Sequence, residues 1–213
     1  MPQTILAICA HNDDQIIGAG GTLAKYARQG KRIRTIICSF GESSHPHLHR
    51  EVIVERRVKE SLRADKILGG SGVAYFGLKE GSFPAEFTNN NIKKKLAWLV
   101  AKEKPTKIFT HSSDDAHPDH RAVNKIVTEL VREKKIPCPV FEFQVWNVIK
   151  ITHRNNPRLV VDITDTFSTK IRAFGAHTSQ KLAFWSLIWN VVFRARIAGL
   201  LHGSTYAEVF YKI

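Results

Sequence analysis

The sequence has few acidic residues, few cysteines and no low-complexity tract, and each shortage excludes a class of protein. It has 19 Asp and Glu residues and 32 Lys and Arg residues, which gives a formal net charge of +13 over 213 residues. Cys9, Cys38 and Cys138 form no CxxC or other metal spacing, so we expect buried thiols in a reducing compartment. No repeat and no Ser/Gly linker marks a boundary, and we predict one domain over residues 1–213.

The N-terminal stretch and the charge suggest where the protein works. Met1-Pro2-Gln3 lacks the basic start and apolar stretch of a secretory signal, so we expect a cytoplasmic protein. The positive charge suits nucleic acid, anionic lipid or an acidic small molecule. The basic residues are scattered rather than gathered with aromatics into a recognisable module, which disfavours nucleic acid and makes a solvated basic surface the simpler interpretation.

Apolar runs alternate with amphipathic segments along the first two thirds of the chain. The expected strands are residues 3–9, 32–40, 72–78, 107–110 and 139–146. The expected helices are residues 22–29, 54–68, 92–100 and 123–131. This alternation predicts a Rossmann-like, three-layer α/β fold with a mainly parallel sheet. Ligands bind such sheets beyond the carboxyl ends of the strands.

The stretch AHNDDQIIGAGG, residues 10–21, follows directly on the first strand. It lacks the third glycine of GxGxxG and the Gly-Lys-Ser/Thr of a P-loop, so it does not predict a nucleotide site. The glycines instead allow the first helix to pack closely on the sheet. His11 and Asp14 are three residues apart and can ligate one metal ion, while Asp13 points elsewhere. For this stretch alone, an aspartate that caps the helix is an equal alternative.

A second polar cluster, residues 111–120, also follows a strand and precedes a helix. His117 and His120 repeat the three-residue spacing. At a shared sheet edge, one of these histidines would complete a His-Asp-His set with an open position, which is typical of catalytic zinc. Imidazole with carboxylate suits zinc better than calcium or magnesium, although other divalent ions remain alternatives.

The motifs AHNDDQ and HPDH, about a hundred residues apart, resemble AHPDDE and HPDH of the LmbE-like (PIG-L) family of zinc-dependent de-N-acetylases. The resemblance extends over nearly the whole chain. Further matching segments are Gly20–Leu23, Gly41–Ser43, the helix with Arg57, Glu60, Ala64 and Leu68-Gly69, Val161–Thr164, Lys170, His177, Ser179-Gln180 and Tyr206–Glu208.

The resemblance implies a role for each residue of the two motifs. His11, Asp14 and His120 would be the zinc ligands, and Asp13 the general base that takes a proton from the attacking water. His117 would be a protonated imidazole that stabilises the oxyanion and protonates the leaving amine, with Asp119 orienting it.

Two positions depart from the family pattern. Asn12 replaces a proline, which we expect to cost the loop rigidity without removing a ligand. Gln15 replaces a glutamate, so a negative charge near the metal is lost. Neither change removes a residue of the proposed mechanism. We therefore predict an active zinc site whose loop rigidity and local charge differ from those of the family.

Substrate contacts are less well defined by the sequence. Arg57 and Glu42 match family positions associated with substrate, although a solvated arginine on a charged helix face is an equal alternative. The alternating histidines of residues 45–49 could bind a metal ion, but an ordinary loop is the simpler interpretation.

Residues 182–193 form the most apolar run, followed by Arg194 and Arg196. The run is too short to span a bilayer. A buried helix or a homo-oligomer contact is the simpler interpretation. The alternative is an interfacial helix that brings a peripheral membrane protein to an anionic surface or a lipid-linked substrate.

The sequence therefore predicts a zinc hydrolase that de-N-acetylates an N-acetylglucosamine-type amino sugar or its conjugate. One alternative is an amidase of a sugar-thiol or another small amide conjugate. An alternative of another class is a non-catalytic polyanion-binding protein on the same scaffold.

Overall fold

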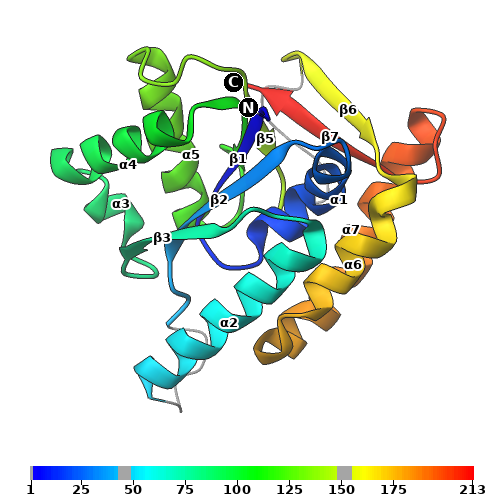
Figure 1. The fold of residues 1–213 in the computed structure, drawn as a ribbon, viewed down its shortest axis with the longest axis horizontal. Coiled ribbons are helices and arrows are strands. Elements are labelled where there is room, and N and C mark those ends of the chain that lie inside the picture. The colour runs from blue at the N-terminus through cyan, green and yellow to red at the C-terminus, as the bar shows by residue number, and fades with distance from the viewer. Residues whose placement is uncertain (1, 43–48, 148–154) are drawn as a thin grey trace.

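The computed structural model describes residues 2–42, 49–147 and 155–213, and within them the core is a seven-stranded sheet (Figure 1). The strands lie in the order β3-β2-β1-β4-β5-β7-β6. Their bounds are β1 (Thr4–Cys9), β2 (Arg32–Ser39), β3 (Val73–Leu78), β4 (Pro105–His111), β5 (Val140–Phe143), β6 (Arg158–Asp162) and β7 (Ala207–Lys212). Strands β1 to β5 pair in parallel, while β7 runs antiparallel to both β5 and β6. The predicted mainly parallel α/β sheet is confirmed.

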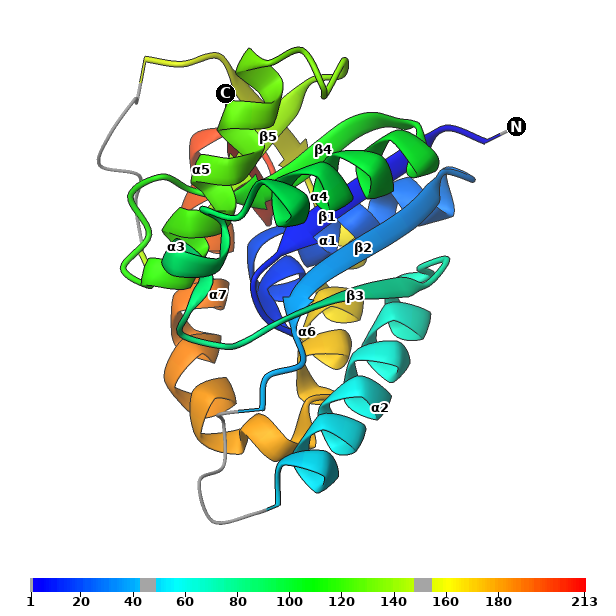
Figure 2. The same ribbon diagram turned by 90° about the vertical axis from the view of Figure 1, so that its left-hand side faces the viewer.

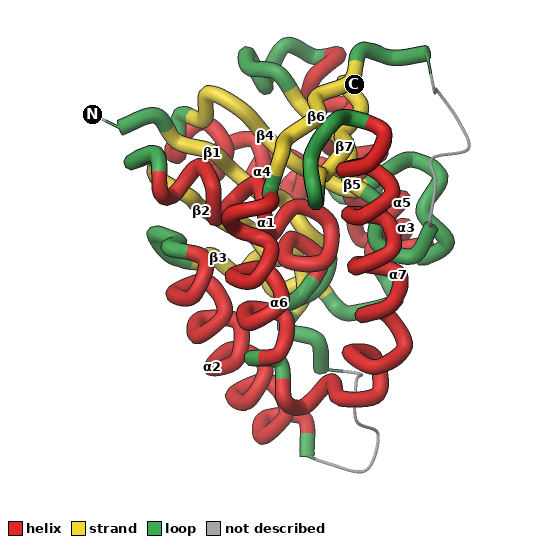
Figure 3. The backbone as a smooth tube through the Cα atoms, turned by 90° about the vertical axis from the view of Figure 1, so that its right-hand side faces the viewer, coloured by secondary structure: helices red, strands yellow, loops and turns green. Residues whose placement is uncertain are grey.

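Helices cover both faces of the sheet (Figures 2 and 3). They are α1 (Asp14–Arg28), α2 (Arg50–Leu68), α3 (Phe83–Glu86), α4 (Asn90–Glu103), α5 (Pro118–Arg132), α6 (Phe167–Gly175) and α7 (Lys181–Leu201), with short 3-10 turns η1 (Thr164–Thr166) and η2 (Thr178–Gln180). Alternate residues of β1 point to opposite faces. Ile5 and Cys9 pack with α1, α2, α6 and α7, whereas Leu6 and Ile8 pack with α4 and α5.

The first helix begins eight residues earlier than predicted. Helix α1 starts at Asp14 and contains Gly18 and Gly21, residues that local propensity disfavours inside a helix. Packing overrides that preference, because a Cβ at Gly18 would lie 2.2 Å from the Phe143 ring and one at Gly21 would lie 2.6 Å from Ile163. The prediction that the glycines allow close packing on the sheet is confirmed for Gly18, which faces β5, whereas Gly21 packs against Ile163 just after β6.

Two strands and one thiol differ from expectation. Strands β6 and β7 were not predicted, and β5 is shorter than the predicted run 139–146. Cys9 and Cys38 are buried as expected, but Cys138 is only half-buried. The histidine-rich loop 45–49 lies outside the described residues except for His49.

A buried ion pair joins the C-terminal strand to the middle of α1. Lys170 Nζ lies 2.6 Å from Glu208 Oε1 and donates to the Ile17 carbonyl oxygen at 2.8 Å. The Glu208 carboxylate in turn accepts the backbone N–H groups of Gly21 at 3.1 Å and Thr22 at 2.7 Å. Family motifs that are distant in the sequence thus form one structural contact that supports the helix of the site.

Replacing Lys170 by methionine should lower the free energy of unfolding by about 3 kcal/mol or more, because Glu208 would stay buried without its cation. Urea unfolding measures the change. Lys59→Met is the matched control, since Lys59 forms an exposed pair with Glu55 and its loss should leave the unfolding midpoint unchanged. Equal midpoints for the two variants would contradict this role.

Candidate active site

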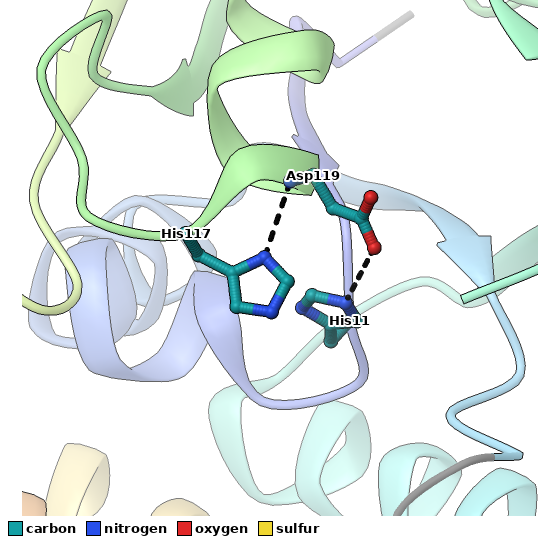
Figure 4. Close-up of side chains that lie close together, drawn as sticks. All are labelled: His11, His117 and Asp119. Atoms are coloured by element: carbon teal, nitrogen blue, oxygen red, sulfur yellow. Dashed lines mark hydrogen bonds and ion pairs between the residues drawn. The ribbon is translucent and has the colours of Figure 1, made fainter. Parts of the chain in front are cut away.

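The two polar clusters of the sequence meet at one edge of the sheet. His11 to Asp14 follow β1, and the residues from His117 to His120 begin α5 just beyond β4. Strands β1 and β4 are neighbours, with Ile8 paired to Thr110. Their carboxyl ends therefore bring together side chains that are about a hundred residues apart in the sequence (Figure 4).

Three buried side chains place one ligand atom each around a common point. His11 Nδ1 lies 3.1 Å from His120 Nε2 and 3.5 Å from Asp14 Oδ2. His120 Nε2 lies 3.3 Å from Asp14 Oδ1. Asp14 is held there because its carboxylate accepts the backbone N–H of His11 at 2.6 Å.

This spacing fits a tetrahedral metal ion. Zinc bonds of about 2.0–2.1 Å at tetrahedral angles place neighbouring ligand atoms about 3.3 Å apart. The three separations of 3.1, 3.3 and 3.5 Å lie near that value, although the two to Asp14 involve different oxygens of its carboxylate. Two imidazoles and one carboxylate are also a donor set that suits zinc. The residues predicted as metal ligands can therefore hold such an ion.

A carboxylate lies behind each of the two ligand histidines. Asp115 Oδ1 lies 2.9 Å from His120 Nδ1, and Asp119 Oδ2 lies 3.5 Å from His11 Nε2. Such partners orient metal-binding imidazoles and raise their basicity. Asp119 is fixed by the backbone N–H of Gly81 at 2.7 Å, so the β3–α3 loop also positions the site.

Two further groups of side chains in the described residues have metal-binding spacing: His11 with His117 and Asp119, and His111 with Asp115 and His120. Both share a histidine with the first triad. Asp14 belongs to the first triad alone, so replacing it tests that arrangement without removing a ligand of the other two.

Asp13 occupies the N-cap position of α1, but its side chain makes no capping hydrogen bond. Its backbone carbonyl accepts the N–H groups of Ile16 at 2.9 Å and Ile17 at 3.0 Å. The carboxylate is buried, and no hydrogen bond engages it within the described parts of the chain. The helix-cap alternative is therefore wrong, and the carboxylate is available for chemistry.

His117 is held by backbone rather than by the Asp119 side chain. Its Nδ1 accepts the backbone N–H of Asp119 at 3.2 Å, whereas the Asp119 carboxylate faces His11 (Figure 4). A neutral His117 therefore carries its proton on Nε2. Burial lowers its pKa, as do the neighbouring His11 and His120, so the structure favours the neutral ring over the predicted protonated one.

Arg57 is a buried cation of α2 rather than a solvated one. It is 3% exposed, and its Nε and Nη1 find no hydrogen-bond partner among the described residues. A Cβ at Gly41 would lie 2.7 Å from Arg57 Nε, which explains the glycine of this loop. Glu42, the other predicted substrate contact, accepts the backbone N–H of Glu80 at 3.1 Å and ties this loop to the one after β3.

The loop containing the departures from the family pattern is held by side-chain hydrogen bonds. Asn12 donates from Nδ2 to the Phe40 carbonyl at 2.9 Å and accepts from the Tyr75 hydroxyl at 2.6 Å. These bonds, to the residue that follows β2 and to a side chain of β3, restrain the loop where the family has a proline ring. Gln15 is buried, and its Nε2 donates to the Asn12 carbonyl at 3.4 Å.

Sequence reasoning assigned no role to His111, Asp115 or His177. His111 stacks on His120 with ring centroids 3.9 Å apart, and its Nε2 accepts the Ala10 N–H at 3.0 Å. His177 is buried with neither ring nitrogen hydrogen-bonded to a described residue, and Asp13 acts on it electrostatically. In the sequence, His111 and Asp115 were marked only by their position in the polar cluster of residues 111–120. His177 was marked only by its match to the C-terminal part of the family pattern.

Protonation should compete with metal binding at this triad. Burial lowers the pKa of His11, but contacts with Asp119 and Asp14 outweigh it and raise the pKa to about 10. Burial opposes a charge on His120 too, but Asp14 and Asp115 raise its pKa to about 9. His11 Nδ1 and His120 Nε2 lie 3.1 Å apart, so only one of these two nitrogens carries a proton, and zinc must displace it because a metal ligand must be neutral.

Zinc added at pH 7 to chelator-treated protein should therefore release about one proton, and its affinity should fall as the pH decreases from 9 to 6. Titration calorimetry in two buffers of different ionisation enthalpy measures the release. A value near zero would show that the imidazoles are already neutral and would contradict these shifts.

Residues 6–131, which contain both polar clusters, match the family model described as GlcNAc-PI de-N-acetylase (PIG-L). The chain belongs to the PIG-L family. A probable N-acetyl-alpha-D-glucosaminyl L-malate deacetylase 2 of Bacillus cereus is 26% identical over 191 residues, which cover 84% of each chain. A diacetylchitobiose deacetylase of Thermococcus kodakarensis is 25% identical over 219 residues, covering 96% of this chain and 80% of the relative. These relatives of the PIG-L protein are N-acetylglucosamine-type deacetylases.

Solved structures share the fold of this PIG-L protein. The N,N'-diacetylchitobiose deacetylase of Pyrococcus horikoshii, in complex with an inhibitor, superposes with a TM-score of 0.82 at 22% identity, covering 99% of this chain and 84% of that one. GalB, a 4-carboxy-2-hydroxymuconate hydratase of Pseudomonas putida, superposes with a TM-score of 0.82 at 21% identity. The match covers 99% of this chain and 96% of GalB. Because the fold also carries a hydratase, the reaction must be argued from the site.

Proposed function

We propose that this PIG-L protein is a metal-dependent hydrolase that removes the acetyl group from an N-acetylated amino sugar of the N-acetylglucosamine type. The observation that carries the proposal is the triad of His11, Asp14 and His120 beside the unbonded carboxylate of Asp13. The deacetylase relatives at 25–26% identity support the amide bond as the target.

The three ligands would hold zinc, although other divalent ions compete for such sites. When bound there, zinc polarises the amide carbonyl and makes water acidic enough to lose a proton near neutral pH. The remaining chemistry is assigned to Asp13 and His117, the N-cap residues of α1 and α5.

Asp13 acts as the general base. It takes a proton from the water that attacks the acetyl carbon, so that the new carbon–oxygen bond forms as the carbonyl oxygen gains negative charge. As the carbon–nitrogen bond breaks, Asp13 returns the proton to the leaving amine. Free acetate and the amino sugar are the products.

His117 acts as a neutral hydrogen-bond donor. Its Nδ1 is occupied by the Asp119 backbone N–H, which leaves the Nε2 proton for the developing oxyanion. This role needs no protonated ring, in keeping with the lowered pKa of His117. The assignment of leaving-group protonation therefore moves from His117 to Asp13.

Arg57 and His177 are candidates for sugar recognition. Both are buried with ring or guanidinium nitrogens that lack hydrogen-bond partners among the described residues. Unpaired buried donors are costly, so a ligand that offers oxygen atoms would be bound favourably there. Glu42 would assist by holding the neighbouring loop.

The experiment is acetate release from a panel of N-acetylated compounds: N-acetylglucosamine, N,N'-diacetylchitobiose, a sugar-thiol conjugate and a simple N-alkyl acetamide. The proposal expects release from the amino sugars that stops on chelation and returns with zinc. Release from the sugar-thiol or acetamide compounds alone would favour the amidase alternative. Inactive, zinc-free protein that binds polyanions would overturn the proposal.

A further inference from the structure

Helix α7 presents large apolar side chains to solvent on one side. The outer stripe of α7 comprises Trp185, Trp189, Phe193, Ile197, Leu200 and Leu201. The first three are 66%, 75% and 58% exposed, and all six are exposed. At 100° per residue they fall within an arc of about 160°. A solvent-facing helix side is ordinarily polar, so a contiguous apolar face of this kind marks an interaction surface.

The other side of α7 is fixed to the protein. Leu187, Val191 and Ala195 are buried in the core. Arg194 donates to the backbone carbonyl oxygens of Gln144 at 2.8 Å and Ile17 at 3.3 Å. Figure 3 shows α7 along the side of the molecule, and α7 packs against β7. By length and composition alone, residues 184–201 could cross a membrane. The predicted apolar run, residues 182–193, was therefore shorter than the apolar part of the helix. The packing of its inner side instead favours a helix that lies along a surface.

The charge around this stripe favours an anionic partner. The 42 residues from Thr166 to Ala207 contain no Asp or Glu. Of the five cations in this stretch, Lys170 is buried in its pair with Glu208 and Arg194 is bonded on the inner side of α7. Arg172 and Arg196 are exposed. Arg196 is exposed and falls within the same arc of the helix as the outer stripe. An apolar stripe that carries an exposed arginine, in a stretch of chain without acidic residues, complements a surface of acyl chains and anionic headgroups.

We propose that the outer stripe of α7 docks this protein on the surface of an anionic lipid bilayer. Tryptophan is suited to the boundary between headgroups and acyl chains, because its ring is largely apolar and its N–H is polar. A second copy of the chain is the competing occupant. It would place two acid-poor surfaces against each other on molecules that each carry +13, which opposes that arrangement.

Vesicle sedimentation with the full chain tests the docking. The protein should co-sediment with vesicles of phosphatidylcholine and phosphatidylglycerol at 7:3, and much less with phosphatidylcholine alone. Raising the salt to 0.5 M should weaken binding, since it screens the headgroup charge. Trp189→Ser combined with Phe193→Ser should lower the partition coefficient by at least about tenfold, because two aromatic rings no longer enter the bilayer.

Trp98→Ser is the matched control, since Trp98 is 59% exposed on α4 and lies outside the stripe. It should bind vesicles like the unmodified protein. The proposal is overturned if the protein does not bind anionic vesicles, or if the stripe and control variants bind equally. It is also overturned if analytical ultracentrifugation finds a stable dimer that the stripe variant abolishes. Acetate release from a soluble substrate should stay unchanged in both variants, which separates this test from that of the proposed function.

Discussion

Replacing Asp13 by asparagine should lower the rate of acetate release by about 10²–10⁴-fold while zinc stays bound. Asparagine keeps the size of the side chain but cannot accept the proton of the attacking water. The carboxylate contributes no ligand atom to the triad and no capping hydrogen bond to α1, so its loss should disturb neither metal nor helix. Steady-state kinetics with zinc analysis of the same sample measures both quantities.

Asp165→Asn is the control for this prediction. Asp165 is an exposed residue of η1, remote in sequence from both polar clusters, and its change should leave turnover and zinc content unaltered. If Asp13→Asn lost its zinc, Asp13 would be a ligand, and the assignment of Asp14 as ligand and Asp13 as general base would be wrong. If the variant kept full activity, another group would be the base.

Replacing Asp14 by asparagine should weaken zinc binding more than replacing Asp115 does. Asp14 belongs to only one of the three arrangements of metal-binding spacing, so its loss tests that arrangement alone. Asp115 stands behind His120 and contacts it at 2.9 Å. Loss of such a backing carboxylate costs about 10–100-fold in metal affinity, and loss of a ligand should cost more.

Competition with a fluorescent chelator measures the two affinities under identical conditions. His117→Ala serves as the control and should retain zinc, because His117 lies outside the proposed triad. Zinc binding that survives Asp14→Asn but fails in His117→Ala would place the metal among His11, His117 and Asp119 instead.

The sequence predicted the position of the site better than its inner contacts. His11, Asp14 and a histidine of the second cluster were recognisable because each cluster follows a strand and the carboxyl ends of parallel strands share one edge. The choice of His120 rather than His117 came from the family resemblance. His111 was missed because it is the last residue of β4, and the pattern does not tell a strand residue that faces the site from one that packs in the core. The contact between Asp115 and His120 depends on how α5 turns away from the sheet.

Longer-range pairing also escaped prediction. Strands β6 and β7 are short and joined through α6 and α7, so no local alternation of strand and helix indicates that β7 lies between β5 and β6. The start of α1 was missed because its glycines have a low helix propensity. The helix forms there because close packing requires small residues at those positions. The buried pair of Lys170 and Glu208 could be listed as family matches, but its structural purpose follows only from the fold.

The placement of the metal is the central claim, and diffraction data collected above and below the zinc absorption edge from zinc-loaded crystals test it most directly. We predict one anomalous peak within about 2.0–2.2 Å of His11 Nδ1, His120 Nε2 and an Asp14 oxygen, with Asp13 outside bonding distance. A peak between His111, Asp115 and His120, or the absence of a peak at this edge of the sheet, would contradict the account.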